Sequence, residues 1–158
     1  MDKQQSNSGI TSTFQFINYK IDKIDFSMTP MTANIICPKE QVSVDFGLAF
    51  PNVQKMQENN GKTSYIARLE AKVTLLNNDE PLAQGIFAIS GMFVTENAFE
   101  EETEQNLIRI QAPAILFPYL RAAITNILAS SGFDTVILPL VNVQAVAKNV
   151  QIEIENLK

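Results

Sequence analysis

Histidine is absent from this chain of 158 residues, and Cys37 is its single cysteine. Histidine is the commonest general base and the commonest metal ligand in proteins, so its absence removes the usual candidates for both roles. A Cys–His or Ser–His nucleophile pair cannot be assembled, and one thiol cannot close an internal disulfide. We therefore expect no metal and no cofactor, and we interpret Cys37 as a small buried apolar residue.

Carboxylates, lysine, tyrosine and serine are the groups that an enzyme built on this chain would have to use. Asp22 and Asp25 lie three residues apart in a strand-like region, so their side chains point to opposite faces and do not form a carboxylate pair. Gly85 and Gly91 lie within a strand pattern and lack the spacing of a phosphate-binding loop. These patterns do not indicate an enzyme.

The composition describes one globular domain with no affinity for nucleic acid. Hydrophobic residues make up 46% of the chain and charged residues 18%, which suits a packed core. The net charge of −5, without clusters of Lys and Arg, argues against binding to phosphate backbones. We expect residues 1–12, which are polar, to form a disordered tail, and residues 13–158 to form a single domain.

The cytoplasm is the expected location. Residues 1–13 contain no apolar run of the kind that a signal peptide needs. The most apolar stretch, residues 112–129, contains Pro113, Pro118 and Arg121, and we expect these residues to make it a poor membrane span.

Alternating apolar residues predict four strands in the first part of the chain. The first, over residues 14–28, shifts its apolar face twice, as β-bulges would cause. The second covers residues 42–50, and the third covers residues 64–76 with one apolar and one charged face. The fourth, over residues 82–94, is apolar on both faces, so both should be covered.

Helices are predicted after these strands. Residues 96–104 hold five glutamates and are interpreted as a solvated loop or the first turn of a helix. A helix is predicted from Pro118 to Ser131, with Pro118 in its first turn. A last helix is predicted to begin after Asn142, a good N-cap, and to extend to about Leu157. The predicted class is α+β, with a four-stranded antiparallel sheet followed by two helices.

Two predicted connections are unusually apolar, at residues 35–37 and 136–141. Connecting segments normally run over the surface and are polar. These two segments either cover the sheet and the helices as part of the core, or they line a groove for an extended apolar peptide. The doubly apolar fourth strand also needs more cover than one layer of helices supplies, which favours self-association.

Two motifs resemble those of the SecB export chaperones. Residues 85–91, Gly-Ile-Phe-Ala-Ile-Ser-Gly, are similar to that family's fourth strand. Residues 112–121, with the run Ile-Leu-Phe-Pro-Tyr and a following Arg, resemble the signature that leads into its first long helix. Ile124-Thr125 and the stretch from Pro139 to Asn142 match as well.

The resemblance implies an ATP-independent chaperone, or holdase, that binds unfolded polypeptides during protein export and assembles as a homotetramer, a dimer of dimers. The peptide-binding groove would then be lined by Phe87, which lies inside a matching motif. From the apolar pattern we add Ile35, Ile36, Leu140, Val143 and Val146 as peptide-binding residues. The first strand and the long helix would form the interfaces between copies, through Phe14, Phe16, Ile124, Ile127 and Leu128.

The chain departs from the family in the features that dock the motor SecA. Lys23 and Ser27 stand where alternation would align acidic residues, and residues 153–158 do not resemble the family's C-terminal tail. The partner could therefore be SecA or an antitoxin, because some SecB-like proteins are dedicated chaperones of one antitoxin. A more remote alternative is a hot-dog-like ligand-binding or thioesterase fold, in which a sheet wraps a helix around a closed pocket.

Overall fold

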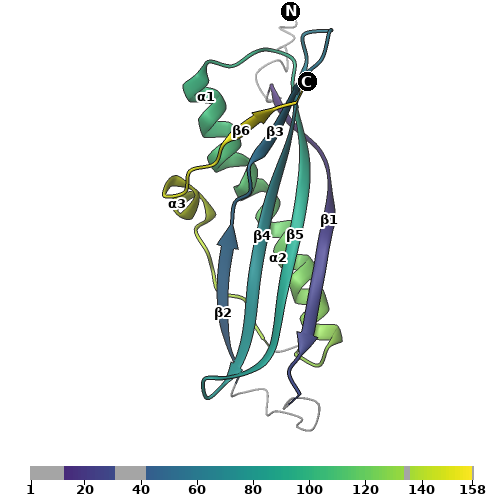
Figure 1. The fold of residues 1–158 in the computed structure, drawn as a ribbon, viewed down its shortest axis with the longest axis vertical. Helices are drawn as coiled ribbons and strands as arrows, with labels where there is room; N and C mark the ends of the chain where they lie inside the picture. Colours follow the sequence, from purple (N-terminus) through teal and green to yellow (C-terminus); the bar gives the residue numbers. More distant parts are fainter. Residues whose placement is uncertain (1–12, 31–41, 134–135, 158) are drawn as a thin grey trace, which may run out of the picture.

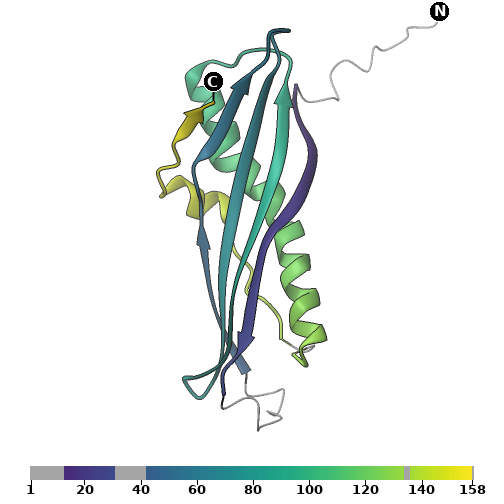
Figure 2. The same cartoon turned by 45° about the vertical axis from the view of Figure 1, so that its right-hand side comes forward.

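A single twisted sheet with helices on one face forms the body of the molecule (Figures 1 and 2). The computed structural model describes residues 13–30, 42–133 and 136–157. Over these residues the opposite face of the sheet carries no helix. The two faces are called the helix face and the outer face below.

Six strands make up this sheet over the described residues. They are β1 (Phe14–Met28), β2 (Val42–Ala49), β3 (Val53–Gln57), β4 (Thr63–Asn77), β5 (Glu80–Thr95) and β6 (Ile154–Asn156). The strand order is β1-β5-β4-β3-β6, and β2 also pairs with β4. All pairs are antiparallel except β3 with β6, which run parallel.

The α+β class is confirmed, but the prediction of a four-stranded antiparallel sheet is wrong in two places. Pro51 ends β2 as expected, yet the chain resumes as β3 after Asn52 and pairs with the same neighbour, β4. Strand β3 was not predicted because most of its residues are polar and show no clear apolar alternation. The sixth strand comes from the C-terminal segment, which was expected to be helical.

The first strand has the irregularity that its shifting apolar pattern predicted. Its pairing with β5 shifts between Phe16 and Asn18 and again between Ile21 and Lys23. Each shift is a bulge that returns apolar side chains to the helix face. As a result, Phe14, Phe16, Ile21, Ile24 and Phe26 share that face, because they lie opposite inward-facing residues of β5.

The core lies between the two central strands and the long helix. The apolar face of β4 is buried as predicted, with Leu69, Val73 and Leu75 fully enclosed. On β5 the residues on the helix face are also fully buried, but Ile86 and Met92 on the outer face are only half-buried. The outer face of β5 is therefore less covered than its apolar sequence predicted.

One continuous helical stretch runs from Glu101 to Ser130. It consists of α1 (Glu101–Asn106), a π-helical segment (Leu107–Gln111) and α2 (Ala112–Ser130). The acidic connection thus becomes helical at Glu101, and Pro118 lies inside α2 instead of in a first turn. The helix begins seventeen residues earlier than predicted because acidic side chains suit a helix N-terminus.

The prolines therefore do not interrupt this stretch, and by length and composition alone it could cross a membrane. Its packing gives the apolar residues another role. Leu116, Leu120 and Ile124 are fully buried in the core of this single chain. A buried core helix passes the same test of length and composition.

The last helix is shorter than predicted. Asn142 is its N-cap, as expected, and its side chain accepts a hydrogen bond from the amide of Ala145 at 3.0 Å. However, α3 spans only Val143–Lys148, and the chain then straightens into β6. The β-branched residues Val150, Ile152 and Ile154 suit a strand as well as they suit the expected helical spacing.

Candidate functional site

The connection between α2 and α3 presents apolar side chains to solvent. Leu138 is buried, whereas Ile137 is 81% exposed and Leu140 is 91% exposed. Arg121 of α2 donates a hydrogen bond from its guanidinium to the carbonyl oxygen of Leu138 at 3.0 Å. This bond and the buried Leu138 fix the connection, so the exposed leucine and isoleucine stand on a held segment.

The second strand adds a row of half-buried apolar side chains on the same face of the sheet. The row consists of Val42, Val44, Phe46 and Leu48, each opposite a buried or half-buried residue of β4. The ring of Phe46 meets that of Phe117 of α2 edge-on, with centroids 6.1 Å apart. In the described part of the chain β2 pairs with β4 alone, so its other edge has no strand beside it.

A second exposed apolar area lies on the other side of α2, where β1 extends beyond the helix. Tyr19, Ile24 and Met28 are between 43% and 50% exposed on the helix face of β1. Tyr19 packs against Tyr119 of α2 with ring centroids 4.5 Å apart, and Phe16 lies 5.6 Å from the same ring. These aromatic contacts join β1 to α2, whereas Ile24 and Met28 further along the strand remain exposed.

The predicted peptide-binding residues divide into exposed and buried ones. Leu140 is exposed, and Val146 of α3 is 36% exposed. Phe87 is fully buried beneath the helix, and Val143 is 5% exposed. Ile35 and Ile36 lie outside the described residues, as does Cys37. Within this single chain, Leu140 and Val146 are the predicted residues that a client could reach directly among those described.

The predicted interface residues divide in the same way. Ile124 and Leu128 are fully buried on the side of α2 that packs in the core of the chain, and Phe14 is 8% exposed. Phe16 and Ile127 are half-buried and reach the surface. The exposed face of α2 instead carries Tyr119, which is 40% exposed.

Sequence reasoning missed Ile137, Tyr19 and Tyr119 as surface residues. Ile137 was recognised only as part of an apolar connection, and the alternation of exposed and buried residues there has no strand or helix period. Tyr119 lies inside the Ile-Leu-Phe-Pro-Tyr run, which identifies the family without indicating which way this side chain points. The signal that could have found it is the helical spacing, because Tyr119 lies off the buried row of Leu116, Leu120, Ile124 and Leu128, which repeats every four residues.

An ion pair and a hydrogen bond join the start of the helical stretch to the sheet. Glu104 of α1 accepts a hydrogen bond from the Tyr65 hydroxyl at 2.6 Å and pairs with the Lys55 ammonium at 2.5 Å. Burial, with the hydrogen bond and negative charge of Glu104, raises the pKa of Tyr65 well above its ordinary value. Lys55 and Glu104 are mostly buried, so this contact orients α1.

The outer face has mixed charge. Asp22, at the second bulge of β1, accepts a hydrogen bond from Ser90 and lies 3.3 Å from Lys20 and 3.6 Å from Arg68. Lys23 lies on the same face, opposite Ala88 of β5. This face is therefore not a continuous acidic surface.

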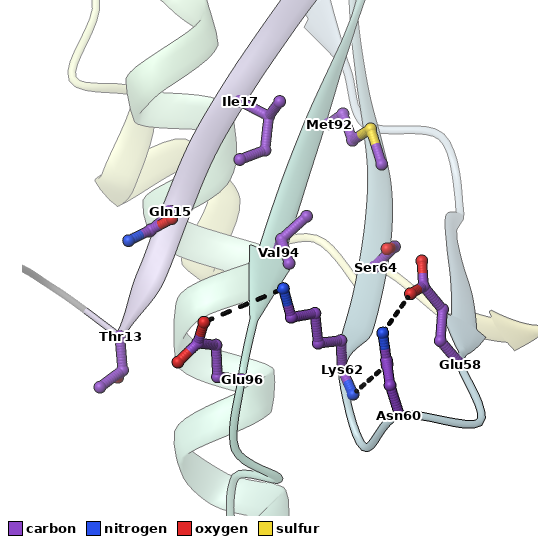
Figure 3. A pocket seen from close by; sticks show the side chains of 10 residues that line it. All are labelled: Thr13, Gln15, Ile17, Glu58, Asn60, Lys62, Ser64, Met92, Val94 and Glu96. Atoms are coloured by element: carbon purple, nitrogen blue, oxygen red, sulfur yellow. Dashed lines mark hydrogen bonds and ion pairs between the residues drawn. The ribbon is translucent and has the colours of Figure 1, made fainter.

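A surface pocket of about 320 Å³ lies near one end of the outer face (Figure 3). Ile17, Met92 and Val94 supply its apolar side chains, and an ion pair of 4.0 Å joins Lys62 to Glu96 at its border. Among the described residues, no three His, Cys, Asp or Glu side chains gather as a metal site would require. The pocket has no arrangement of groups that indicates a reaction.

Comparison with protein families places these features in a known context. Residues 9–153 match the family described as preprotein translocase subunit SecB. The chain is 32% identical to the protein-export protein SecB of Methylococcus capsulatus, over 83% of this chain and 81% of that protein. It is 31% identical to the same protein of Methylibium petroleiphilum, over 73% of this chain and 68% of that one.

Other relatives match over a shorter region. The protein-export protein SecB of Neisseria meningitidis is 31% identical over 62% of this chain, and the match spans 64% of its own length. Among solved structures, the fold is similar to that of a SecB-like chaperone of Mycobacterium tuberculosis in complex with an antitoxin peptide. The TM-score is 0.63 at 13% identity, over 81% of this chain and 90% of that one. The resemblance inferred from the motifs is thus confirmed.

Proposed function

Because this chain belongs to the SecB family, we propose that it is an ATP-independent chaperone that holds extended segments of non-native polypeptides for protein export. The family assignment replaces the thioesterase-like alternative. The proposed role needs apolar surface that an unfolded chain can reach, and it needs no catalytic group.

The exposed apolar connection carries this proposal. Ile137 and Leu140 are among the most exposed large apolar side chains of the described residues, yet they stand on a segment that is held by Arg121. Large apolar side chains fixed in water contribute nothing to the stability of the chain that bears them. They do offer a preorganised surface to an extended apolar segment, and the half-buried row on β2 offers another on the same face.

The direct test replaces both exposed residues by aspartate. We expect Ile137→Asp/Leu140→Asp to bind reduced, carboxymethylated lactalbumin, a permanently unfolded probe, at least about tenfold more weakly, because two apolar contacts are lost and charge is introduced. Fluorescence anisotropy of the labelled probe measures the dissociation constant. A light-scattering assay of client aggregation measures holdase activity in parallel.

The matched control is Ile17→Asp/Ile66→Asp, which changes two exposed isoleucines on the outer face. Both double variants should retain the far-ultraviolet circular dichroism and urea midpoint of the wild type. Equal loss of binding in the two variants would show that general apolarity, and not the helix-face surface, binds the probe. Unchanged binding in both would remove the proposed site.

Self-association is part of the proposed function. The apolar face of α2 that carries Tyr119 is exposed in a single chain, and so is the helix face of β1 at Ile24 and Met28. A second copy that covers these areas would bury apolar side chains that the single chain leaves exposed. We propose a homotetramer, built as a dimer of dimers, that acts in the cytoplasm.

A dedicated antitoxin chaperone is the second candidate, and two observations favour it. The outer face has mixed charge around Asp22, and residues 154–156 near the end of the sequence pair with β3 as strand β6. Family members dock SecA through acidic residues on the exposed sheet face and a distinctive C-terminal tail, and residues 153–158 do not resemble that tail. The structural neighbour contains an antitoxin peptide. Export predicts binding to SecA and to many unfolded clients, whereas the dedicated role predicts tight binding to one antitoxin and weak binding to the lactalbumin probe.

A further inference from the structure

The C-terminal strand β6 lies along an edge of the sheet that an extended polypeptide could use. Val53 of β3 donates a backbone hydrogen bond to the carbonyl of Glu153 at 2.9 Å, and Leu157 donates one to the carbonyl of Lys55 at 2.8 Å. The Asn52 side chain donates to the Glu155 carboxylate at 3.0 Å. The edge of β3 therefore binds a strand that runs parallel to it.

The strand that occupies this edge is weakly held. It has three residues, Ile154–Asn156, and two of them are exposed. Ile154 is half-buried, and Leu157 at its end is 43% exposed. Ile152, just before the strand, is its one well-buried anchor. A short parallel strand with so little buried apolar surface opens more readily than the central strands do.

The residues on both sides of this contact are held independently of it. β3 remains paired with β4 over Gln54–Gln57, and Lys55 is fixed by Glu104. At the other end, the Arg109 guanidinium donates a hydrogen bond to the carbonyl of Val150 at 2.6 Å. The chain can therefore open after Val150 without loss of β3 or of α3.

The edge of β3 continues that of β2. Both strands pair with β4 and run in the same direction, separated by Phe50–Asn52 (Figure 1). Within the described residues, β2 has no strand on its other side, whereas β3 has β6 there. Departure of β6 would thus lengthen the available edge from β2 alone to β2 and β3 together.

We propose that β6 is a built-in competitor that occupies the β3 edge until an extended client segment displaces it. The incoming segment would run parallel to β3 and supply apolar side chains at the positions of Ile152 and Ile154. This inference rests on the proposed chaperone function. It adds that client binding is limited by a strand of the chain itself.

Hydrogen exchange on the wild-type protein tests the displacement. With the carboxymethylated lactalbumin bound, we expect the Leu157 amide to exchange about tenfold faster or more, because its acceptor is taken by the client. The Val53 amide should stay protected, because a client carbonyl replaces that of Glu153. If the anisotropy shows bound probe and the Leu157 amide is unchanged, the inference is wrong and the proposed function stands.

A variant of β6 tests the competition. Glu155→Pro removes a backbone N–H from the strand and should make probe binding about tenfold tighter, because an occupied edge lowers the apparent affinity. Glu155→Ala, which retains the N–H, is the matched control. A labelled peptide of residues 150–158 should bind Glu155→Pro and not the wild type. Failure of this peptide to bind overturns the inference, whereas failure of the probe to bind any variant overturns the proposed function.

Discussion

Tyr65 is the residue at which burial and hydrogen bonding have the clearest energetic consequence. Its ring lies in the core, and its hydroxyl donates to Glu104, which itself pairs with Lys55. Both the desolvation and the carboxylate favour the neutral phenol, so the pKa of Tyr65 is raised in the folded protein. The contact that orients α1 is therefore also a source of pH-dependent stability.

Alkaline pH should remove that stability. An unfolded tyrosine titrates near pH 10, whereas the folded Tyr65 keeps its proton to higher pH. Below pH 10 both states are protonated and the stabilisation is complete. Above pH 10 the unfolded chain loses its proton first, so the free energy of unfolding falls, by up to about 1.4 kcal/mol per pH unit from this group.

Urea denaturation between pH 8 and pH 11.5 measures this effect. Tyr65→Phe should show a shallower decline above pH 10 than the wild type, because it has no phenol to titrate. Glu104→Gln should lower the stability at pH 8, because it leaves the mostly buried Lys55 ammonium without its carboxylate. Parallel curves for the wild type and Tyr65→Phe would contradict the role given to Tyr65.

At the scale of elements, the contact between α2 and β5 depends on Gly91. A Cβ atom at this position would lie 2.4 Å from Cδ2 of Leu116, closer than real Cβ contacts. The missing side chain lets the helix approach the strand, which accounts for one of the glycines in the motif that resembles the SecB fourth strand. The position is thus a packing requirement and not a phosphate-binding feature.

Gly91→Ala should therefore destabilise the protein by about 1–3 kcal/mol, because Leu116 must move within a packed core. The control is Gly47→Ala on β2, where an added Cβ meets nothing within 4 Å. That variant should be neutral or slightly stabilising, since glycine weakens a strand. The urea midpoint of each variant measures the change in stability. Equal midpoints for Gly91→Ala and Gly47→Ala would show that Leu116 accommodates the methyl group.

At the scale of the whole molecule, the exposed apolar side chains of the helix face lie in two separate areas. Tyr119, Ile24 and Met28 lie on the side of α2 away from the connection that bears Leu140. In the proposed function, the area on β1 and α2 serves contacts between copies and the connection between α2 and α3 stays free for clients. This separation predicts that assembly and client binding can be changed independently.

Tyr119→Glu should reduce the solution mass from the proposed tetramer of 17.6 kDa chains, because a charge enters the apolar face of α2. Light scattering coupled to size exclusion measures the mass. Ile66→Glu, an equally exposed site on the outer face, should leave the mass unchanged. A wild-type protein that is strictly monomeric would contradict the proposed assembly.

The sequence by itself determined the class, the family and the central strands of this protein. The alternation on β4 and β5 specifies one buried face, because side chains in a strand point to opposite sides with a period of two. The two changes of apolar face along β1 also predicted its two register shifts correctly. The two motifs identified the family because they combine strand and helix packing in a specific order.

Only the tertiary structure decided which apolar residues are surface and which are core. Phe87 and Leu140 are both apolar and both were predicted to bind peptide, yet one is fully buried and the other is 91% exposed. Burial depends on what lies across the sheet, and here the helix from Glu101 to Ser130 covers Phe87 and leaves the connection open. The conformation of the C-terminal segment also depends on residues far away in the sequence, because β6 forms by pairing with the edge of β3.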